Sequence, residues 1–347
     1  MRRGFLVAAA ALGIAAASLV FVAQPAAAQE HTYYIAADDV VWNPIPAGKD
    51  VGDPRPISQL APSSLGWKFH LLVYREYTDS SFKTLAQRPA SEQYLGIAGP
   101  LMHAEVGDSI VVVFKNHTRF PLNMRPNGLK SAEGTQLVAT GGQKTYHWSV
   151  PDTSGPGPSD GSSILWTYQA DGKGLAQTGL YGPIIVTRRG MARADGMPTD
   201  VDREFVVWFH EIAYTESAAW AESLADPATN PHHLKATSFP PPVMTGNNFY
   251  VNLNGYDYDN MPMLYMHKGE RVRWYIFSSS SDFDAHAPSW EGQTVLYRGT
   301  RADVIPLGVN EPAVVDMIPD NPGVWKLYCS VNIHLDFGMQ ARFTVLP

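Results

Sequence analysis

The stretch Tyr328-Cys329-Ser330-Val331-Asn332-Ile333-His334-Leu335-Asp336-Phe337-Gly338-Met339 carries three spaced metal-binding side chains. Cys329 is the only cysteine of the 347 residues, and His334 and Met339 follow it in a C-x4-H-x4-M pattern. A thiolate, two imidazoles and a weak axial thioether form a blue-copper site. We predict that His286 supplies the second imidazole from an earlier strand. The alternative is a buried cysteine without metal and Met339 as core filler, which leaves the spacing unexplained.

Short β-rich runs recur along the whole chain, and the sequence has no long helical repeat of apolar residues. The runs cover 33–35, 109–114, 182–186, 205–209, 271–277, 324–329 and 343–346, divided by Gly, Pro, Asn and Asp. This pattern predicts an all-β chain of sandwiches or barrels. Residues 106–114 resemble residues 268–277, and a repeat of about 160 residues fits a duplicated domain. We therefore predict domains over 29–189 and 204–347, joined by a linker over 190–203.

The first 28 residues have the pattern of an export signal. Arg2 and Arg3 precede an apolar run over 7–22, which ends in Pro25-Ala26-Ala27-Ala28-Gln29. This order predicts a signal peptide cleaved after Ala28. A membrane anchor is the alternative, but the run is short and rich in alanine. The paired arginines resemble a twin-arginine signal, and we predict export to the periplasm or medium, with no membrane span after processing.

The charge and the single cysteine narrow the function further. Cleavage removes two arginines and no acid, so the net charge changes from −7 to −9. An acidic surface argues against nucleic acid as a partner. One cysteine cannot form an internal disulfide, and a metal explains why an exported protein keeps a thiol. The new terminus Gln29-Glu30-His31 could bind a cupric ion in square-planar fashion, or it could be a loose chain end.

Several motifs resemble the ceruloplasmin and hephaestin branch of the two-domain multicopper oxidase superfamily. They are Tyr33-Tyr34-Ile35-Ala36-Ala37, Tyr74-Arg75-Glu76-Tyr77-Thr78-Asp79, Gly99-Pro100-Leu101, Gly155-Pro156-Gly157-Pro158, Gly179-Leu180-Tyr181-Gly182-Pro183 and Asn254-Gly255-Tyr256. The resemblance covers residues 32–346. It implies two cupredoxin-like Greek-key β-sandwich domains in tandem, with one type 1 copper in the second. The implied ligands are His286, Cys329, His334 and Met339.

The chain departs from this family at eight positions. Members that reduce dioxygen carry four histidine pairs, which bind three further coppers. The corresponding positions here hold Arg125, Asn127, Gln169, Asp171, Ser289, Glu291, Tyr328 and Ser330. By the internal repeat, the first domain also lacks type 1 ligands, because Leu122, Ala170 and Pro183 stand at their positions. The resemblance therefore implies one type 1 copper per chain, a structural first domain and no oxygen-reducing cluster.

Three functions remain open. Reduction of dioxygen needs four electrons at metal centres with open positions, whereas one blue copper exchanges one electron. We therefore predict a one-electron carrier. Its partner would be a redox protein or a small metal-ion or organic donor. The second is an oxidase acting at the copper edge, of ferroxidase, cuprous oxidase or laccase-like type, or using another metal at the substituted positions. Asp282, Asp284 and Asp336 could attract a cation there. The third is copper binding or homeostasis, which Met261, Met263 and Met266 suggest, although such residues more often fill cores.

The expected assembly also follows from the resemblance. Two-domain relatives form trimers in which the first domain of one subunit packs against the second domain of its neighbour, so we expect a homotrimer. Copper nitrite reductase is a trimer of the same kind, but it needs a second copper on three interfacial histidines. The eight substituted positions argue against that activity.

Overall fold

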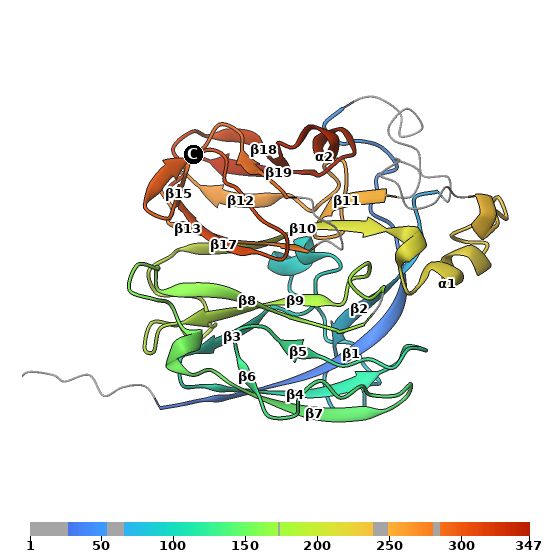
Figure 1. Cartoon of the computed structure of the whole chain (residues 1–347). Coiled ribbons are helices and arrows are strands. Elements are labelled where there is room, and N and C mark those ends of the chain that lie inside the picture. Colours follow the sequence, from blue (N-terminus) through green and yellow to red (C-terminus); the bar gives the residue numbers. More distant parts are fainter. Residues whose placement is uncertain (1–26, 54–65, 173, 239–248, 280–284) are drawn as a thin grey trace, which may run out of the picture.

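Four β-sheets account for most of the regular secondary structure within the described residues. The computed structural model describes residues 27–53, 66–172, 174–238, 249–279 and 285–347. Its sheets pair into two β-sandwiches, the first from the N-terminal half and the second from the C-terminal half (Figure 1). The predicted all-β fold class with two tandem cupredoxin-like sandwiches is therefore confirmed.

The first sandwich contains nine strands within the described residues. One sheet has the order β2-β1-β4-β7-β6, and the facing sheet has the order β3-β9-β8-β5. The strands are β1 (Glu30–Trp42), β2 (Phe69–Glu76), β3 (Met102–Glu105), β4 (Ser109–Asn116), β5 (Arg125–Pro126), β6 (Lys130–Ser131), β7 (Gln143–Ser149), β8 (Ser163–Gln169) and β9 (Tyr181–Thr187). The pairs β1–β4 and β3–β9 are parallel, and the other pairs are antiparallel.

The second sandwich repeats this plan. Its sheets have the orders β11-β10-β13-β17-β15-β16 and β12-β19-β18-β14, again with two parallel pairs, β10–β13 and β12–β19. The strands are β10 (Arg203–Ala213), β11 (Phe249–Leu253), β12 (Leu264–His267), β13 (Val272–Ser279), β14 (Pro288–Trp290), β15 (Val295–Tyr297), β16 (Thr300–Ala302), β17 (Pro312–Met317), β18 (Gly323–Cys329) and β19 (Gln340–Leu346). Two short helices, α1 (Trp220–Ala225) and α2 (Asn332–Asp336), lie outside the sheets.

Two glycines show how the halves correspond. Gly128 and Gly292 have φ of 77° and 67°, a left-handed conformation that glycine adopts without strain. A Cβ on Gly128 would lie 2.1 Å from the ring of Trp166, and one on Gly292 would lie 2.4 Å from that of Trp325. Because each glycine packs its backbone on a tryptophan of the neighbouring strand, the two positions are equivalent.

The pairing of neighbouring strands also shows which substituted positions of the two halves correspond to each other. The Asn127 N–H donates to the Thr167 carbonyl at 2.7 Å, and the Glu291 N–H donates to the Lys326 carbonyl at 2.9 Å. Arg125 and Asn127 therefore correspond to Ser289 and Glu291. By the same register, Gln169 and Asp171 correspond to Tyr328 and Ser330, on either side of Ala170 and Cys329.

One equivalence expected from the sequence is wrong. The sequence repeat aligns Pro183 with Met339, but the Ala170 N–H donates to the Leu180 carbonyl just as the Cys329 N–H donates to the Met339 carbonyl. Leu180 is therefore the counterpart of Met339. The misleading feature is a glycine at both places. Gly182 lies within β9 against Tyr168, whereas Gly338 is in a turn with φ of 95°.

The two sandwiches pack through an apolar interface. Buried residues of β2, β8 and β9 form one continuous core with those of β10, β13 and β17, and the rings of Tyr181 and Trp208 lie 5.2 Å apart across the boundary. Arg273 on β13 is 2% exposed and donates to Ser162, Ser163 and Asp200. The interface therefore combines apolar burial with a buried guanidinium.

Some predictions fall outside what the structure tests. The domain limits at residues 189 and 204 stay predictions, although the sheets divide between Thr187 and Arg203. Most of the proposed signal peptide, residues 1–26, lies outside the described residues. Across the described parts of the chain, none of the helices has the length and apolar character needed to cross a membrane.

Candidate metal centre

Three side chains from separate segments converge inside the second sandwich. Cys329 ends β18, His334 lies in α2, and His286 precedes β14. The Cys329 Sγ lies 3.4 Å from the His334 Nδ1 and 3.8 Å from the His286 Nδ1. One ligand atom from each of the three residues lies within 4.8 Å of the others, and all three residues are buried. The pair predicted from C-x4-H and the distant histidine therefore meet at one point.

The backbone holds these side chains in place. β14 pairs with β18 so that Pro288 faces Cys329, and the Ala287 N–H donates to the Cys329 Sγ at 3.3 Å. The Met339 carbonyl accepts the Cys329 N–H at 3.1 Å, and the Met339 N–H donates to the His334 carbonyl at 2.9 Å. The turn from Cys329 to Met339 is therefore closed at both ends. Met339 is 0% exposed and belongs to the same hydrophobic core as Cys329.

A buried carboxylate that sequence reasoning missed lies behind the two imidazoles. Glu211 on β10 is 1% exposed. Its Oε1 lies 3.2 Å from the His334 Nε2 and 3.8 Å from the His286 Nε2. Each ring thus turns its Nδ1 to the sulfur and its Nε2 to the carboxylate. The sequence does contain one signal for Glu211. Residues 205–209 form a strongly apolar run that is predicted to be a strand, and an acidic residue follows this run closely.

Burial keeps two imidazoles near the centre neutral. It lowers the pKa of His286 to about 3, helped by repulsion from the positive charge that His334 and His210 carry when they are protonated. Burial also lowers the pKa of His210, on the opposite face of β10, to about 4, although hydrogen bonds with the backbone of Ser279 and Thr178 partly offset it. Since a metal binds the neutral imidazole, His286 is ready for a metal ion at neutral pH.

The donor geometry fits a small transition-metal ion. With bonds of about 2.3 Å to sulfur and about 2.0 Å to nitrogen, trigonal ligation puts these atoms about 3.7 Å apart. The two observed separations, 3.4 and 3.8 Å, bracket that value. Two imidazoles and a thiolate in a trigonal set are the donors that copper takes in electron-transfer sites.

The four substituted positions of the first sandwich form a hydrogen-bonded network. Arg125 Nε donates to Asp171 Oδ1 at 2.7 Å, and Arg125 Nη1 donates to Asn127 Oδ1 at 2.5 Å. Asn127 Nδ2 in turn donates to Gln169 Oε1 at 3.0 Å. A guanidinium at the centre of this group repels cations, and the neighbouring oxygens already accept hydrogen bonds. The arrangement is unfavourable for a metal.

The four substituted positions of the second sandwich lie elsewhere. Ser289, Glu291, Tyr328 and Ser330 line a depression of about 780 Å³, which also carries Asp303 and Asp320. Arg125, Asn127 and Gln169 line a separate hollow of about 310 Å³. Within the described part of the chain, the two hollows share no lining residue. One chain therefore does not bring the two sets together.

The remaining candidates of the sequence have other surroundings. Asp282 and Asp284 lie outside the described residues, and Asp336 is exposed. Met261 and Met266 are buried in the core, as expected of gap-filling methionines, and Met263 is half-buried. The His31 Nε2 lies 3.0 Å from Asp108 Oδ2, so this imidazole has a carboxylate partner within the first sandwich.

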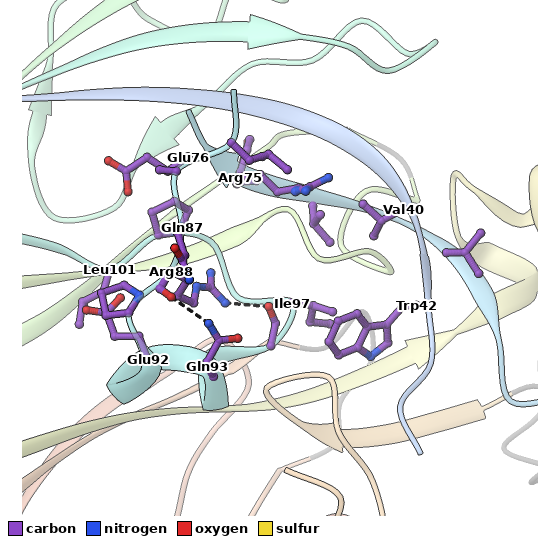
Figure 2. A pocket seen from close by; sticks show the side chains of 18 residues that line it. Val40, Trp42, Arg75, Glu76, Gln87, Arg88, Glu92, Gln93, Ile97 and Leu101 are labelled. Atoms are coloured by element: carbon purple, nitrogen blue, oxygen red, sulfur yellow. Dashed lines mark hydrogen bonds between the residues drawn. The ribbon is translucent and has the colours of Figure 1, made fainter. Parts of the chain in front are cut away.

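Another cavity lies in the first sandwich, away from these groups. It measures about 500 Å³ between β1, β2 and the 3-10 helix Ala90–Leu95. Figure 2 shows Val40 and Trp42 at one end and Glu76 and Glu92 at the other. Its 18 lining residues include no candidate ligand and no substituted position, so the cavity is separate from the metal centre.

Known proteins are similar to this chain over most of its length. A family model described as multicopper oxidase matches residues 226–347. The chain is 33% identical to hephaestin of Mus musculus over 336 residues, which are 90% of this chain and 28% of that protein. It is 33% identical to ceruloplasmin of Ovis aries over 339 residues, which are 90% of this chain and 32% of that protein. The chain thus spans less than a third of the length of these relatives.

A solved structure shares this fold. A crystal structure described as a multicopper oxidase superposes with a TM-score of 0.59 at 16% identity, covering 91% of this chain and 89% of that one. At such low identity this similarity concerns the fold alone. Together with the matched family model and the relatives at 33% identity over nine-tenths of the chain, it leads to one assignment. The chain belongs to the multicopper oxidase superfamily, a family of copper proteins.

Proposed function

We propose that the protein is an exported type 1 copper redox protein that carries one electron at a time. The main observation behind this proposal is that the Cys329 Sγ and the Nδ1 atoms of His286 and His334 lie close together in the buried interior. Bound copper would supply a reversible change between the cupric and cuprous states. The cofactor in this proposal is one copper per chain.

Each residue has a distinct part in this proposal. Cys329, His286 and His334 would hold the ion, and Met339 would be the weak axial ligand. The Ala287 N–H, 3.3 Å from the Cys329 Sγ, stabilises negative charge on the sulfur. The buried surroundings exclude water from the donors, so a bound copper ion would change oxidation state with little rearrangement of solvent.

The substituted positions support a carrier over an oxidase of the dioxygen-reducing kind. Water formation from dioxygen takes four electrons at metals with open positions. Four of the eight positions that would hold such metals are joined here by hydrogen bonds around Arg125. The partner in this proposal is a redox protein or a small metal-ion or organic donor.

Copper content, colour and electron count test the proposal together. The holoprotein should contain one copper per chain, absorb strongly in the visible region, and take up one electron per chain from a titrated reductant. An oxygen electrode with excess ferrous ion should register no sustained uptake. Two or more tightly bound coppers per chain, or a colourless copper-loaded protein, would contradict the carrier.

An oxidase acting at the type 1 site is the second candidate. One relative, 33% identical over 342 residues, is named a ferroxidase, HEPHL1 of Mus musculus, and the exposed Asp336 lies two residues from His334. Sustained oxygen uptake with ferrous or cuprous ion, or with an organic donor, would favour this function. Binding of several coppers without redox turnover would favour copper homeostasis instead.

We also propose a homotrimer. The two sets of substituted positions line separate hollows in one chain, so only contact between copies would bring them together. Light scattering after size-exclusion chromatography should give three chains per particle. A monomer at micromolar concentration would overturn this part of the proposal.

N-terminal sequencing of the exported protein tests whether the signal peptide is cleaved after Ala28.

A further inference from the structure

We infer that Glu211 positions both ligand histidines and places a fixed negative charge behind the copper ion. This inference rests on the proposed function, because it concerns the same centre. Glu211 lies far before His286 in the sequence and belongs to none of the motifs that mark the ligands. It is therefore a positioning residue that the structure, rather than the spacing of the ligands, brings to the centre.

Strand geometry brings Glu211 to the centre. Side chains alternate between the two faces of a strand, so Phe209 and Glu211 point the same way from β10. The rings of Phe209 and His286 lie 5.7 Å apart, which marks this as the face toward the candidate ligands. His210, between them, points to the other face and lies 3.0 Å from the Thr178 carbonyl. Glu211 is therefore aimed at the centre by its place in the sheet.

The contacts favour one position for the hydrogen of each ring. An ionised carboxylate attracts an N–H group and repels a nitrogen lone pair, so it favours the form of each ring that carries its hydrogen on the nitrogen facing Glu211. The Oε1 of Glu211 lies 3.2 Å from the His334 Nε2 and 3.8 Å from the His286 Nε2. The lone pair of each neutral ring is then on Nδ1, which faces the Cys329 Sγ. One oxygen thus prepares both imidazoles for the metal.

The charge of Glu211 also bears on the oxidation state. A thiolate and one ionised carboxylate balance the two positive charges of a cupric ion, whereas a cuprous ion leaves one negative charge in excess. Charges act strongly on each other where water is excluded, and Glu211 is 1% exposed. The carboxylate therefore favours the cupric state and lowers the reduction potential.

Two variants separate the charge of Glu211 from its polar contact with the two rings. Glu211→Gln keeps an acceptor oxygen and removes the charge, so the protein should stay blue. Its affinity for cuprous ion relative to cupric ion should rise about tenfold, which equals a rise of about 59 mV in the reduction potential. Glu211→Leu removes the acceptor, so copper affinity should fall about 10- to 100-fold, as for other lost partners of metal-binding histidines. Glu204→Gln on the same strand is the control, since its carboxylate pairs with His103 in the first sandwich, and it should change neither quantity.

A measurement on the copper-free protein tests the positioning role alone. Nitrogen-15 NMR of the imidazole rings should show His286 and His334 protonated at Nε2 in the parent protein, and a mixture of the two ring forms in Glu211→Leu. Parent rings protonated at Nδ1, or variants with unchanged ring forms, affinity and potential, would overturn the inference. A parent protein that binds no copper but shows the Nε2 form would reject the proposed function and still support the positioning role of Glu211.

Discussion

The two sandwiches use the same backbone positions for opposite purposes. Cys329 and Met339 of the second sandwich correspond to Ala170 and Leu180 of the first. His286 forms a two-way backbone bridge with Leu307, and Leu122 forms the same bridge with Val138. Where one half gathers metal-binding atoms, the other packs apolar side chains that are at most 6% exposed. The fold of the first half therefore closes without metal-binding side chains at these positions, and the copper chemistry that we propose would be an addition to the second half.

The largest effect should come from exchanging sulfur for oxygen at matched positions. Cys329→Ser removes the thiolate that selects copper, so the variant should be colourless and lose most of its copper. Ala170→Ser, at the corresponding position of the first sandwich, should keep the full colour and one copper per chain. Visible spectra and metal analysis of both variants check this. A blue Cys329→Ser protein would break the comparison.

The next effect separates metal binding from packing. His286→Ala removes a ligand, so copper affinity should fall by more than the roughly 100-fold expected for loss of an outer partner. Leu122→Ala, in the equivalent position, leaves a cavity and should lower the free energy of unfolding by about 2–5 kcal/mol, with copper content unchanged. Chemical denaturation and copper titration measure the two quantities. Equal loss of copper in both variants would mean that the halves are not independent in function.

A smaller effect concerns the contact between the halves. Arg273 donates to Asp316 at 2.7 Å and to Asp200 at 3.2 Å. Arg273→Met should lower the free energy of unfolding by about 2–3 kcal/mol, less than for a fully buried pair, because both carboxylates remain partly in water. Arg271→Met, whose ion pair with Asp202 is on the surface, should cause little measurable change. Equal unfolding midpoints for the two variants would show that the buried guanidinium adds no stability.

The smallest effect is a difference in pH dependence. Burial alone would lower the pKa of His103, but the hydrogen bond and charge of Glu204 outweigh it and raise that pKa. Its stabilising contribution is therefore present below about pH 6.5 and lost as the pH rises through the raised pKa. His210, with a pKa of about 4, acts in the opposite direction, because the unfolded chain takes up a proton first as the pH falls below about 6.5.

Two variants of the copper-free protein check these signs. His210→Gln should reduce the loss of unfolding free energy as the pH falls from about 6.5 to 5. For one proton, this loss is at most about 1.4 kcal/mol per pH unit. His103→Gln should reduce the loss of unfolding free energy as the pH rises above about 6.5. Denaturant midpoints measured from about pH 5 to 8 give both slopes. Slopes that match the parent protein would show that neither histidine titrates as the structure indicates.

Much of the fold could be predicted because its signals are local. Alternating apolar runs and turn residues predicted an all-β chain, and the repeat between residues 106–114 and 268–277 predicted two similar halves. Both predictions are confirmed. The match of Gly182 with Gly338 was misleading, because a glycine alone does not show whether it serves a turn or close packing. Leu180, rather than Pro183, proved to be the counterpart of Met339.

The sequence by itself determined the donor types, since the spacing of Cys329, His334 and Met339 can be read along one short segment. Only the tertiary structure decided that His286, 43 residues earlier, has its Nδ1 3.8 Å from the sulfur, and that Glu211 lies behind both rings. The physical reason is that spacing within a turn is fixed by local geometry. Contacts between strands far apart in sequence depend on sheet register, which many residues set together.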